Sequence, residues 1–162
     1  VHDAVHVHAG RYWDVFWVCN VAAVVVGPTI LLRSPLLACA ALTWLLPGTV
    51  VWLADAAIAG SNILPTSYAV HFGGTAAAFY ATWRAGYSRR GWLAALALLA
   101  FCIVVSRFFL PAAANVNAAH AIPRGWSSVA QSRSAFVLSA TALAAVACTL
   151  GSAVSRAVAK LR

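Results

Sequence analysis

Apolar residues along this chain fall into five long blocks, and shorter polar stretches separate each block from the next. Each block approaches the roughly 20 residues that an α-helix needs to cross the hydrocarbon core of a bilayer. Within a block the apolar residues run on instead of alternating with polar ones, so half-buried strands are not indicated. The pattern predicts five transmembrane helices, at residues 15–32, 36–59, 63–83, 91–110 and 135–157.

Short polar stretches connect the first four blocks, and one long stretch connects the fourth block to the fifth. Residues 33–35 read Arg-Ser-Pro, and proline cannot continue a helix, so we expect a tight turn there. Residues 59–65 and 84–90 make the next two connections. The last connection, residues 111–133, is long for a loop in a compact domain, and loops of that length are often functional.

The composition agrees with a membrane protein. The 162 residues are 63% hydrophobic and 9% charged, whereas a soluble domain carries about 25% charged residues. The net charge of +8 would also fit nucleic-acid binding, but the basic residues flank the apolar blocks instead of clustering on one polar face. We therefore expect an all-α, single-domain, multi-pass protein of the cell or inner membrane, spanning residues 1–162 and binding lipid rather than nucleic acid.

Lysine and arginine residues divide unevenly between the two ends of the predicted helices. Seven lie on the side of the C-terminus and three on the side of the N-terminus. Because cytoplasmic loops carry the excess of basic residues, we expect the N-terminus outside and the C-terminus in the cytoplasm. Cytoplasmic labelling of the N-terminus would contradict this orientation. The two sets are Arg33, Arg84, Arg89, Arg90, Arg156, Lys160 and Arg162, and Arg11, Arg124 and Arg133.

Small and helix-breaking residues within the blocks bear on how the helices pack. Glycine and proline pairs at residues 27–28, 47–48 and 73–74 either kink helices around a cavity or are ordinary packing features. The fifth block repeats small residues at four-residue spacing, which permits close contact within the fold, with a second copy or with other membrane subunits. These small residues are Ala147, Gly151 and Ser155.

Three ionisable residues, Asp55, His71 and Arg107, lie within apolar blocks near the predicted outer ends. A charged side chain within the bilayer is costly, so such residues are functional candidates. Asp55 and Arg107 have similar predicted depths, and our hypothesis is that they pair, with His71 beside them. The alternatives are a purely structural ion pair, snorkelling of Arg107 to the headgroups, and a hydrogen bond from His71 to a neighbouring helix.

Further polar residues lie at the same outer level. Asn115, Asn117 and His120 follow the fourth block, Trp126 lies near the outer interface, and Asn20 lies in the outer part of the first block. We expect an outward-facing polar pocket in which Asn20, Asn115, Asn117 and Trp126 bind a ligand. The two loop asparagines equally suit the capping of a short helix or turn.

The N-terminal sequence VHDAVHVH is a weaker candidate, for a metal site. His2 and His6 are spaced for one face of a helix, and His6 and His8 for one face of a strand, so all three cannot share a face. Imidazole ligands suit zinc, copper or nickel. The sequence identifies no cofactor.

Three functions remain open from the sequence, and the third, a transporter or channel, would need oligomerisation because five spans do not form an even inverted repeat in one chain. The first is a binding or accessory subunit that holds a lipid, a cofactor or partner helices. The second is a membrane enzyme acting on a lipid or isoprenoid at the outer leaflet, with His71 or His120 as acid or base and Asp55 or Arg107 as electrostatic partner. The chain has three acidic side chains and lacks the HEXXH, GxSxG and P-loop signatures, which favours the first function.

Overall fold

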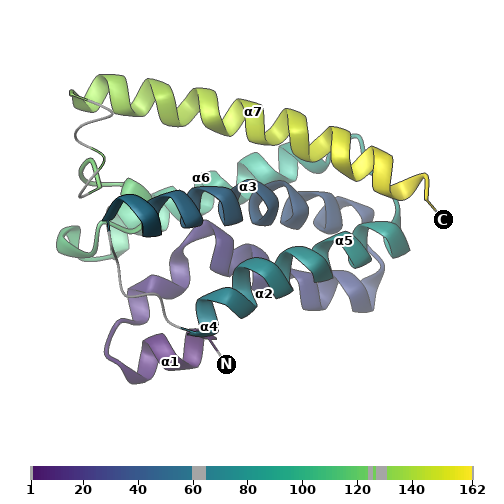
Figure 1. Ribbon diagram of the computed structural model, residues 1–162, viewed down its shortest axis with the longest axis horizontal. Coiled ribbons are helices and arrows are strands. Elements are labelled where there is room, and N and C mark those ends of the chain that lie inside the picture. The colour runs from purple at the N-terminus through teal and green to yellow at the C-terminus, as the bar shows by residue number, and fades with distance from the viewer. Residues whose placement is uncertain (1, 60–64, 124–125, 127–130, 162) are drawn as a thin grey trace.

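In the computed structural model, the described residues 2–59, 65–123, 126 and 131–161 form helices and turns, with no strand among them (Figure 1). Three 3-10 turns, η1, η3 and η4, and one π-helical segment, η2, join the α-helices. The elements in order are α1 (His2–His8), η1 (Tyr12–Phe16), α2 (Val18–Leu32), α3 (Pro35–Ala59), α4 (Pro65–Tyr68), η2 (Ala69–Gly73), α5 (Gly74–Ala85), α6 (Gly91–Phe109), η3 (Ala112–Ala114), η4 (Val116–Ala118) and α7 (Arg133–Ala159).

The helices of the described residues confirm the all-α class and provide three candidate membrane spans of a multi-pass protein, instead of five full-length ones. Helices α3, α6 and α7 are long and apolar enough to cross a membrane, with mean hydropathies of 1.9, 2.2 and 1.9. Helix α2 is equally apolar in character but has only 15 residues. It begins at Val18 rather than at the predicted residue 15, because Tyr12–Phe16 forms a separate 3-10 turn.

The third predicted block is a segmented helix instead of one uniform span. Its predicted start, Ile63, lies outside the described residues, and from Pro65 to Ala85 the chain runs through α4, the π-helical η2 and α5. Inside η2 the carbonyl of His71 lies 3.0 Å from Thr49 Oγ1 of α3, and Thr75 Oγ1 lies 3.0 Å from the same hydroxyl. Irregular helical turns often occur where a side chain inserts between the backbone hydrogen-bonding groups of the helix.

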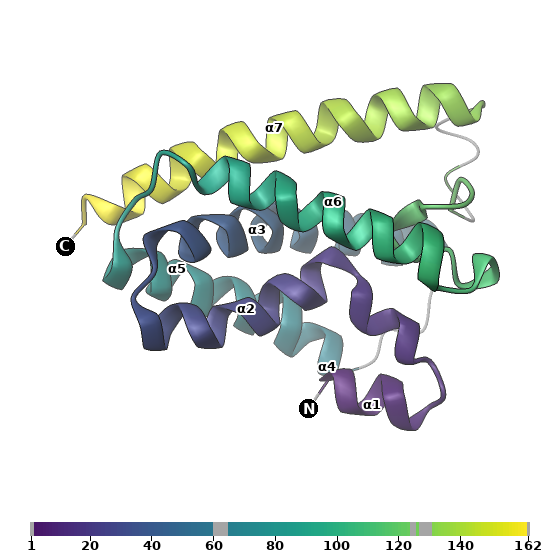
Figure 2. The same ribbon diagram turned by 180° about the vertical axis from the view of Figure 1, so that it is seen from behind.

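Helix α3 is the central helix, and it continues through Pro47. Half of its most apolar window is buried, against 17% for α6 and for α7, so the latter two expose most of their surface. Ala38–Leu45 is buried on all sides, and Trp44 Nε1 donates to the carbonyl of Ala95 on α6 at 2.7 Å. Figure 2 shows α2, α5 and α6 arranged around α3, with α7 along one side of the bundle.

The chain reverses direction at each successive long helix, so its connections gather at two ends (Figures 1 and 2). We call the end that holds α1, η1, η3 and η4 the loop end. The other, which holds residues 33–34, residues 86–90 and the end of α7, is the arginine end. The described lysine and arginine residues of the two predicted sets therefore lie at opposite ends of the bundle. Arg124 and Arg162 lie outside the described residues.

The small residues of α7 face α3, so they make the contact within the fold that their spacing allowed, while self-association of the chain stays a prediction. Ala147, Gly151 and Ser155 are all buried. A methyl group added at Gly151 would meet the Thr43 side chain and lie 2.8 Å from Thr43 Cα. Small residues let two backbones approach closely in membrane helices. Here that approach joins two helices of the same chain.

Candidate functional site

Asp55 and Arg107, which we expected to form an ion pair, bind different partners in the structure. Asp55 Oδ1 accepts a hydrogen bond from Trp126 Nε1 at 2.8 Å, and Arg107 Nη1 donates to His120 Nδ1 at 2.8 Å. Both ion pairs found among the described residues involve Asp14 instead. The proposed Asp55–Arg107 pair is therefore wrong for this structure. Similar depth did not bring the two side chains to the same side of the bundle.

His120 is fixed by two bonds, one at each ring nitrogen. An arginine has no acceptor, so Nδ1 of His120 must accept from Arg107, and Nε2 then donates to the carbonyl of Ser106 at 3.0 Å. This arrangement calls for a neutral ring that carries its proton on Nε2. A proton-transfer role for His120 would first have to break one of these two bonds.

Both loop asparagines act on backbone groups. Asn117 Oδ1 accepts from Val18 N at 2.9 Å, at the start of α2, while its Nδ2 donates to Phe16 O at 2.8 Å and to Ser106 Oγ at 3.0 Å. Asn115 Oδ1 accepts from the amides of His120 and Ala121, and its Nδ2 donates to Ala121 O. Asn117 therefore serves the first amide of the distant helix α2, and Asn115 holds its own loop without a side-chain cap on η4. Both have positive φ, 46° for Asn115 and 53° for Asn117, which asparagine tolerates better than most residues.

His71 lies in an aromatic cluster on the far side of α3 from these contacts with Arg107. Its ring is 4% exposed and stacks on Trp52, with centroids 4.5 Å apart and an interplanar angle of 11°. Tyr68 and Phe72 meet the same tryptophan edge-on, at 5.2 and 6.2 Å. The cluster packs η2 against α3, and this stacking is a contact that the sequence did not predict for His71.

The N-terminal residues hold η1 in place. Asp14 Oδ2 lies 3.1 Å from His6 Nδ1 and 3.5 Å from Arg11 Nε. Asn20 Nδ2 donates to the carbonyl of Asp14 at 2.8 Å, so Asn20 supports this turn from the first turn of α2. The predicted ligand-binding residue Asn20 is 4% exposed.

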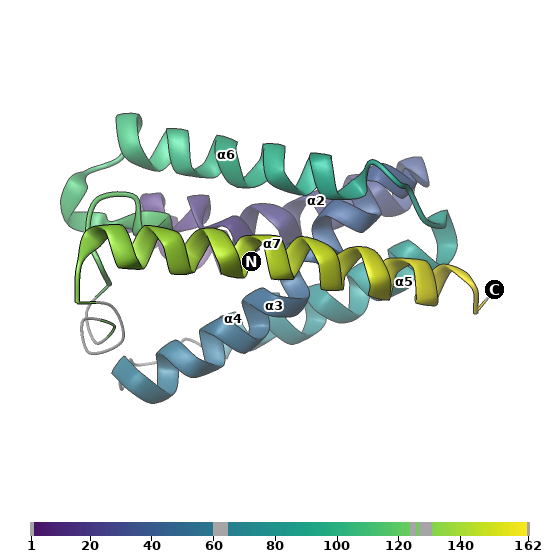
Figure 3. The same ribbon diagram turned by 90° about the horizontal axis from the view of Figure 1, so that it is seen from above.

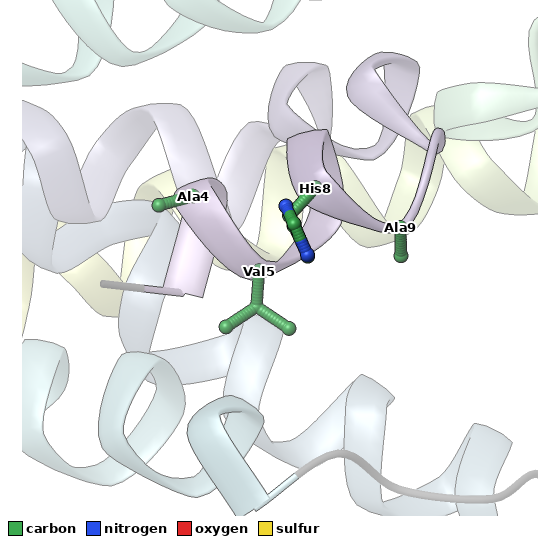
Figure 4. A pocket seen from close by; sticks show the side chains of 4 residues that line it. All are labelled: Ala4, Val5, His8 and Ala9. Atoms are coloured by element: carbon green, nitrogen blue, oxygen red, sulfur yellow. The ribbon is translucent and has the colours of Figure 1, made fainter.

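The candidate metal residues do not gather around a common point. His8 is exposed and borders a shallow hollow on α1 with Ala4, Val5 and Ala9 (Figure 4), while His6 points to Asp14. The side chain of His2 lies outside what the structure describes. Among the described residues no three His, Cys, Asp or Glu side chains are placed to hold a metal ion.

A larger hollow lies between α6 and α7, where the sequence gave no reason to look. This α6–α7 groove encloses about 880 Å³, a size within the usual range for small-molecule pockets. Its walls are apolar: Leu96, Leu99 and Ile103 come from α6, and Trp44 of α3 contributes to its floor. The α7 wall consists of Phe136, Val137, Ala140, Thr141, Leu143, Ala144, Ala145, Cys148, Thr149 and Ser152. Figure 3 shows α7 running alongside α6.

The charged and amide side chains of the groove lie at the loop end, whereas its hydroxyl side chains are spread along α7, at Thr141, Thr149 and Ser152. Thr141 and Thr149 donate to carbonyls of their own helix at 2.8 and 2.9 Å. The loop end is lined by Asn117, Ala118 and Ala119 of the loop and Arg133 at the start of α7. Arg133 Nη2 donates to Ala119 O at 3.0 Å, and its guanidinium carbon lies 5.9 Å from the centroid of the Phe136 ring. The sequence placed Arg133 only as a charge that sets orientation. Leu96, Leu99 and Ile103 share one helical face, but this spacing does not distinguish a groove wall from any other apolar face.

No family model matches this chain, and neither the curated proteins nor the solved structures contain a match to it. Its own residues are therefore the basis for its function. The described residues offer an apolar groove with a basic polar end, and tightly hydrogen-bonded polar contacts outside that groove.

Proposed function

We propose that this chain is a membrane-embedded binding protein that holds the hydrocarbon chain of a lipid in the α6–α7 groove. The observation that carries the proposal is the groove itself, whose lining is mainly apolar along its length and has its charged and amide side chains at one end. A lipid has the same division between chain and head. Binding sites for small molecules usually combine an apolar lining with a few polar groups that fix orientation.

The length of the groove supports a lipid chain over a compact ligand. Its wall extends from Trp92 to Ile103 on α6 and from Phe136 to Ser152 on α7. At 1.5 Å per residue these stretches measure about 17 Å and about 24 Å. One leaflet of hydrocarbon is about half of 30 Å thick. A chain that enters from the loop end therefore fits along the groove at the depth it already has in the bilayer.

The polar residues favour binding over catalysis. An enzyme of the kind we considered would use His71 or His120 with Asp55 or Arg107. His71 stacks on Trp52, His120 is bonded through both ring nitrogens, and Asp55 accepts from Trp126. Catalytic roles for these four residues remain untested, and none of the four lines the α6–α7 groove.

Filling the groove should remove the lipid. Ala140 of α7 lines the groove, so Ala140→Phe places a ring where the chain would lie. We expect native mass spectrometry of gently extracted protein to show a retained lipid on the wild type and little or none on Ala140→Phe.

Leu138→Phe is the matched control, because Leu138 lies on the same helix, is 71% exposed and is not part of the groove lining. This variant should retain the lipid as the wild type does. Equal retention by all three proteins, or wild-type protein that carries no lipid, would contradict the proposed function.

A further inference from the structure

One arginine, Arg133, lines the loop end of the α6–α7 groove, and a second, Arg107, lies outside the lining on the neighbouring helix α6. Arg107 lies one turn beyond Ile103 on α6, at the i+4 position on the same face. Arg133 lies one turn before Phe136 and Val137 on α7. Each of the two helices that supply the apolar walls therefore carries a guanidinium at the same end of the molecule.

Consecutive residues of one loop anchor both guanidiniums. Arg107 Nη1 donates to the ring of His120 at 2.8 Å, and Arg133 Nη2 donates to the carbonyl of Ala119 at 3.0 Å. The loop itself is held, because Asn115 accepts from the amide of His120 at 3.0 Å. Each guanidinium carries five N–H donors, so these bonds fix the arginines while leaving donors for a ligand. Arg107 and Arg133 are both exposed.

The chain supplies no carboxylate to this pair of arginines among the residues described. Its three acidic side chains are Asp3, Asp14 and Asp55. Asp14 is paired with His6 and Arg11, and Asp55 accepts from Trp126. No ion pair of the described residues includes Arg107 or Arg133. Two positive charges at the mouth of an apolar groove call for an anion from outside the chain.

We propose that Arg107 and Arg133 bind the phosphate of a lipid headgroup whose hydrocarbon chain lies in the α6–α7 groove. This inference rests on the proposed function and names the class of ligand that the groove selects. The planar fork of arginine matches the geometry of phosphate oxygens, and charge-assisted bonds of this kind are stronger than neutral ones. A free phosphate would gain nothing from the apolar walls, whereas a phospholipid engages both parts.

The test compares two lipids that differ only in the phosphate. Dioleoyl phosphatidic acid and dioleoylglycerol carry the same chains, and each is added to delipidated full-length protein in detergent and followed by native mass spectrometry. We expect the wild type to bind phosphatidic acid about tenfold more tightly than dioleoylglycerol, since two exposed charges together contribute about 1.4 kcal/mol. In the double variant Arg107→Gln, Arg133→Gln this preference should fall to about one while dioleoylglycerol binding remains.

Glutamine Nε2 lies two bonds closer to the backbone than arginine Nη, so the contacts with His120 and Ala119 are lost with the charge. Retained binding of dioleoylglycerol shows that the groove of the double variant is intact. Arg89→Gln, Arg90→Gln is the matched control, because it removes two exposed arginines at the other end of the molecule. This control should keep the preference for phosphatidic acid.

The outcomes separate the headgroup site from the groove. If wild type binds both lipids equally, the headgroup site is overturned and the groove stands. If the control loses the preference as much as the double variant does, net charge explains the selectivity and the site is again overturned. If wild type binds neither lipid, both proposals fail. If the wild type is a dimer and Ala140→Phe is a monomer, the groove binds a second copy of the chain, and both proposals are overturned.

Discussion

Asn117 connects three parts of the chain that are far apart in sequence. Its side chain reaches Phe16 and Val18 at the start of α2 and Ser106 near the end of α6. The first amides of a helix have no partner within the helix, and they cannot rely on water where they are shielded from it. At the scale of single residues, the polar groups of the loop end mainly satisfy backbone groups of their own chain.

Replacing Asn117 by alanine should therefore destabilise the fold. The change leaves Val18 N, Phe16 O and Ser106 Oγ without this partner, in half-buried surroundings. We expect the free energy of unfolding in detergent micelles to fall by about 2–3 kcal/mol, measured by denaturant titration.

Asn115→Ala is the control, because Asn115 shares the positive φ but bonds only to the local residues His120 and Ala121. The backbone penalty of the change is thus common to both variants. The loss of unfolding free energy should be at least about 1 kcal/mol smaller for Asn115→Ala than for Asn117→Ala. Equal losses would mean that the long-range bonds of Asn117 contribute nothing beyond its backbone conformation.

The sequence predicted the depth of the polar residues but not their direction around the bundle. Asp55, His71 and Arg107 all fall toward the loop end, as their places in the apolar blocks require. Their partners depend on which way each helix faces, and a mean hydropathy pattern with many apolar residues on every side does not fix this. That is why Asp55 meets Trp126 and Arg107 meets His120.

At the scale of helices, α7 packs closely against α3 through small residues. Gly151 lies against Thr43, and Ala147 and Ser155 are buried one turn to either side. Apolar burial drives helix association less in lipid than in water, so close packing of small residues carries more of the stability. The spacing in the sequence predicted a contact surface on α7, while its partner emerged only from the fold.

Gly151→Ala should weaken this contact. The added methyl group would lie 2.8 Å from Thr43 Cα, which is a backbone atom and cannot rotate away. We expect a loss of about 1–3 kcal/mol in the free energy of unfolding, seen as a lower midpoint in thermal unfolding of the detergent-solubilised protein.

Gly73→Ala provides the comparison, because Gly73 has helical dihedral angles (φ −65°, ψ −45°) and a methyl group there meets no heavy atom within 4 Å. Alanine has the higher helix propensity, so this variant should be neutral or slightly more stable. If both alanine variants behave alike, the contact of Gly151 with Thr43 is not tight.

The segmented third block shows what a hydropathy pattern leaves out. Its apolar residues and its Gly73-Gly74 pair were evident, but the π-helical turn depends on Thr49 and Thr75 beside the His71 carbonyl. Those contacts join two helices, and a single-helix pattern carries no information about them.

The whole molecule is polarised along its long axis. Acidic, amide and histidine side chains lie at the loop end, whereas the arginine end holds Arg33, Arg84, Arg89, Arg90, Arg156 and Lys160. The predicted orientation in the membrane and the proposed lipid binding both depend on this asymmetry. Which end faces the cytoplasm stays a prediction from the arginine count. The groove adds a second asymmetry, because its basic groups lie at the end opposite to the larger cluster of arginines.

The groove could not be predicted from the sequence because it depends on how far apart two helices lie. Leu99 and Ala144 are ordinary apolar residues, and nothing in their spacing distinguishes a wall of a groove from a packed contact or a lipid-facing surface. Only the positions of α6 and α7 over α3 make them neighbours of an open space.

Photo-crosslinking tests the binding of a lipid chain in the groove most directly. A trace of phosphatidic acid with a diazirine on its acyl chain would be added to the protein in phosphatidylcholine nanodiscs, illuminated, and the adducts mapped by peptide mass spectrometry. The account predicts adducts concentrated on groove residues such as Leu99 and Ala144. Adducts confined to outward-facing residues such as Val104 and Leu138, with none in the groove, would contradict it.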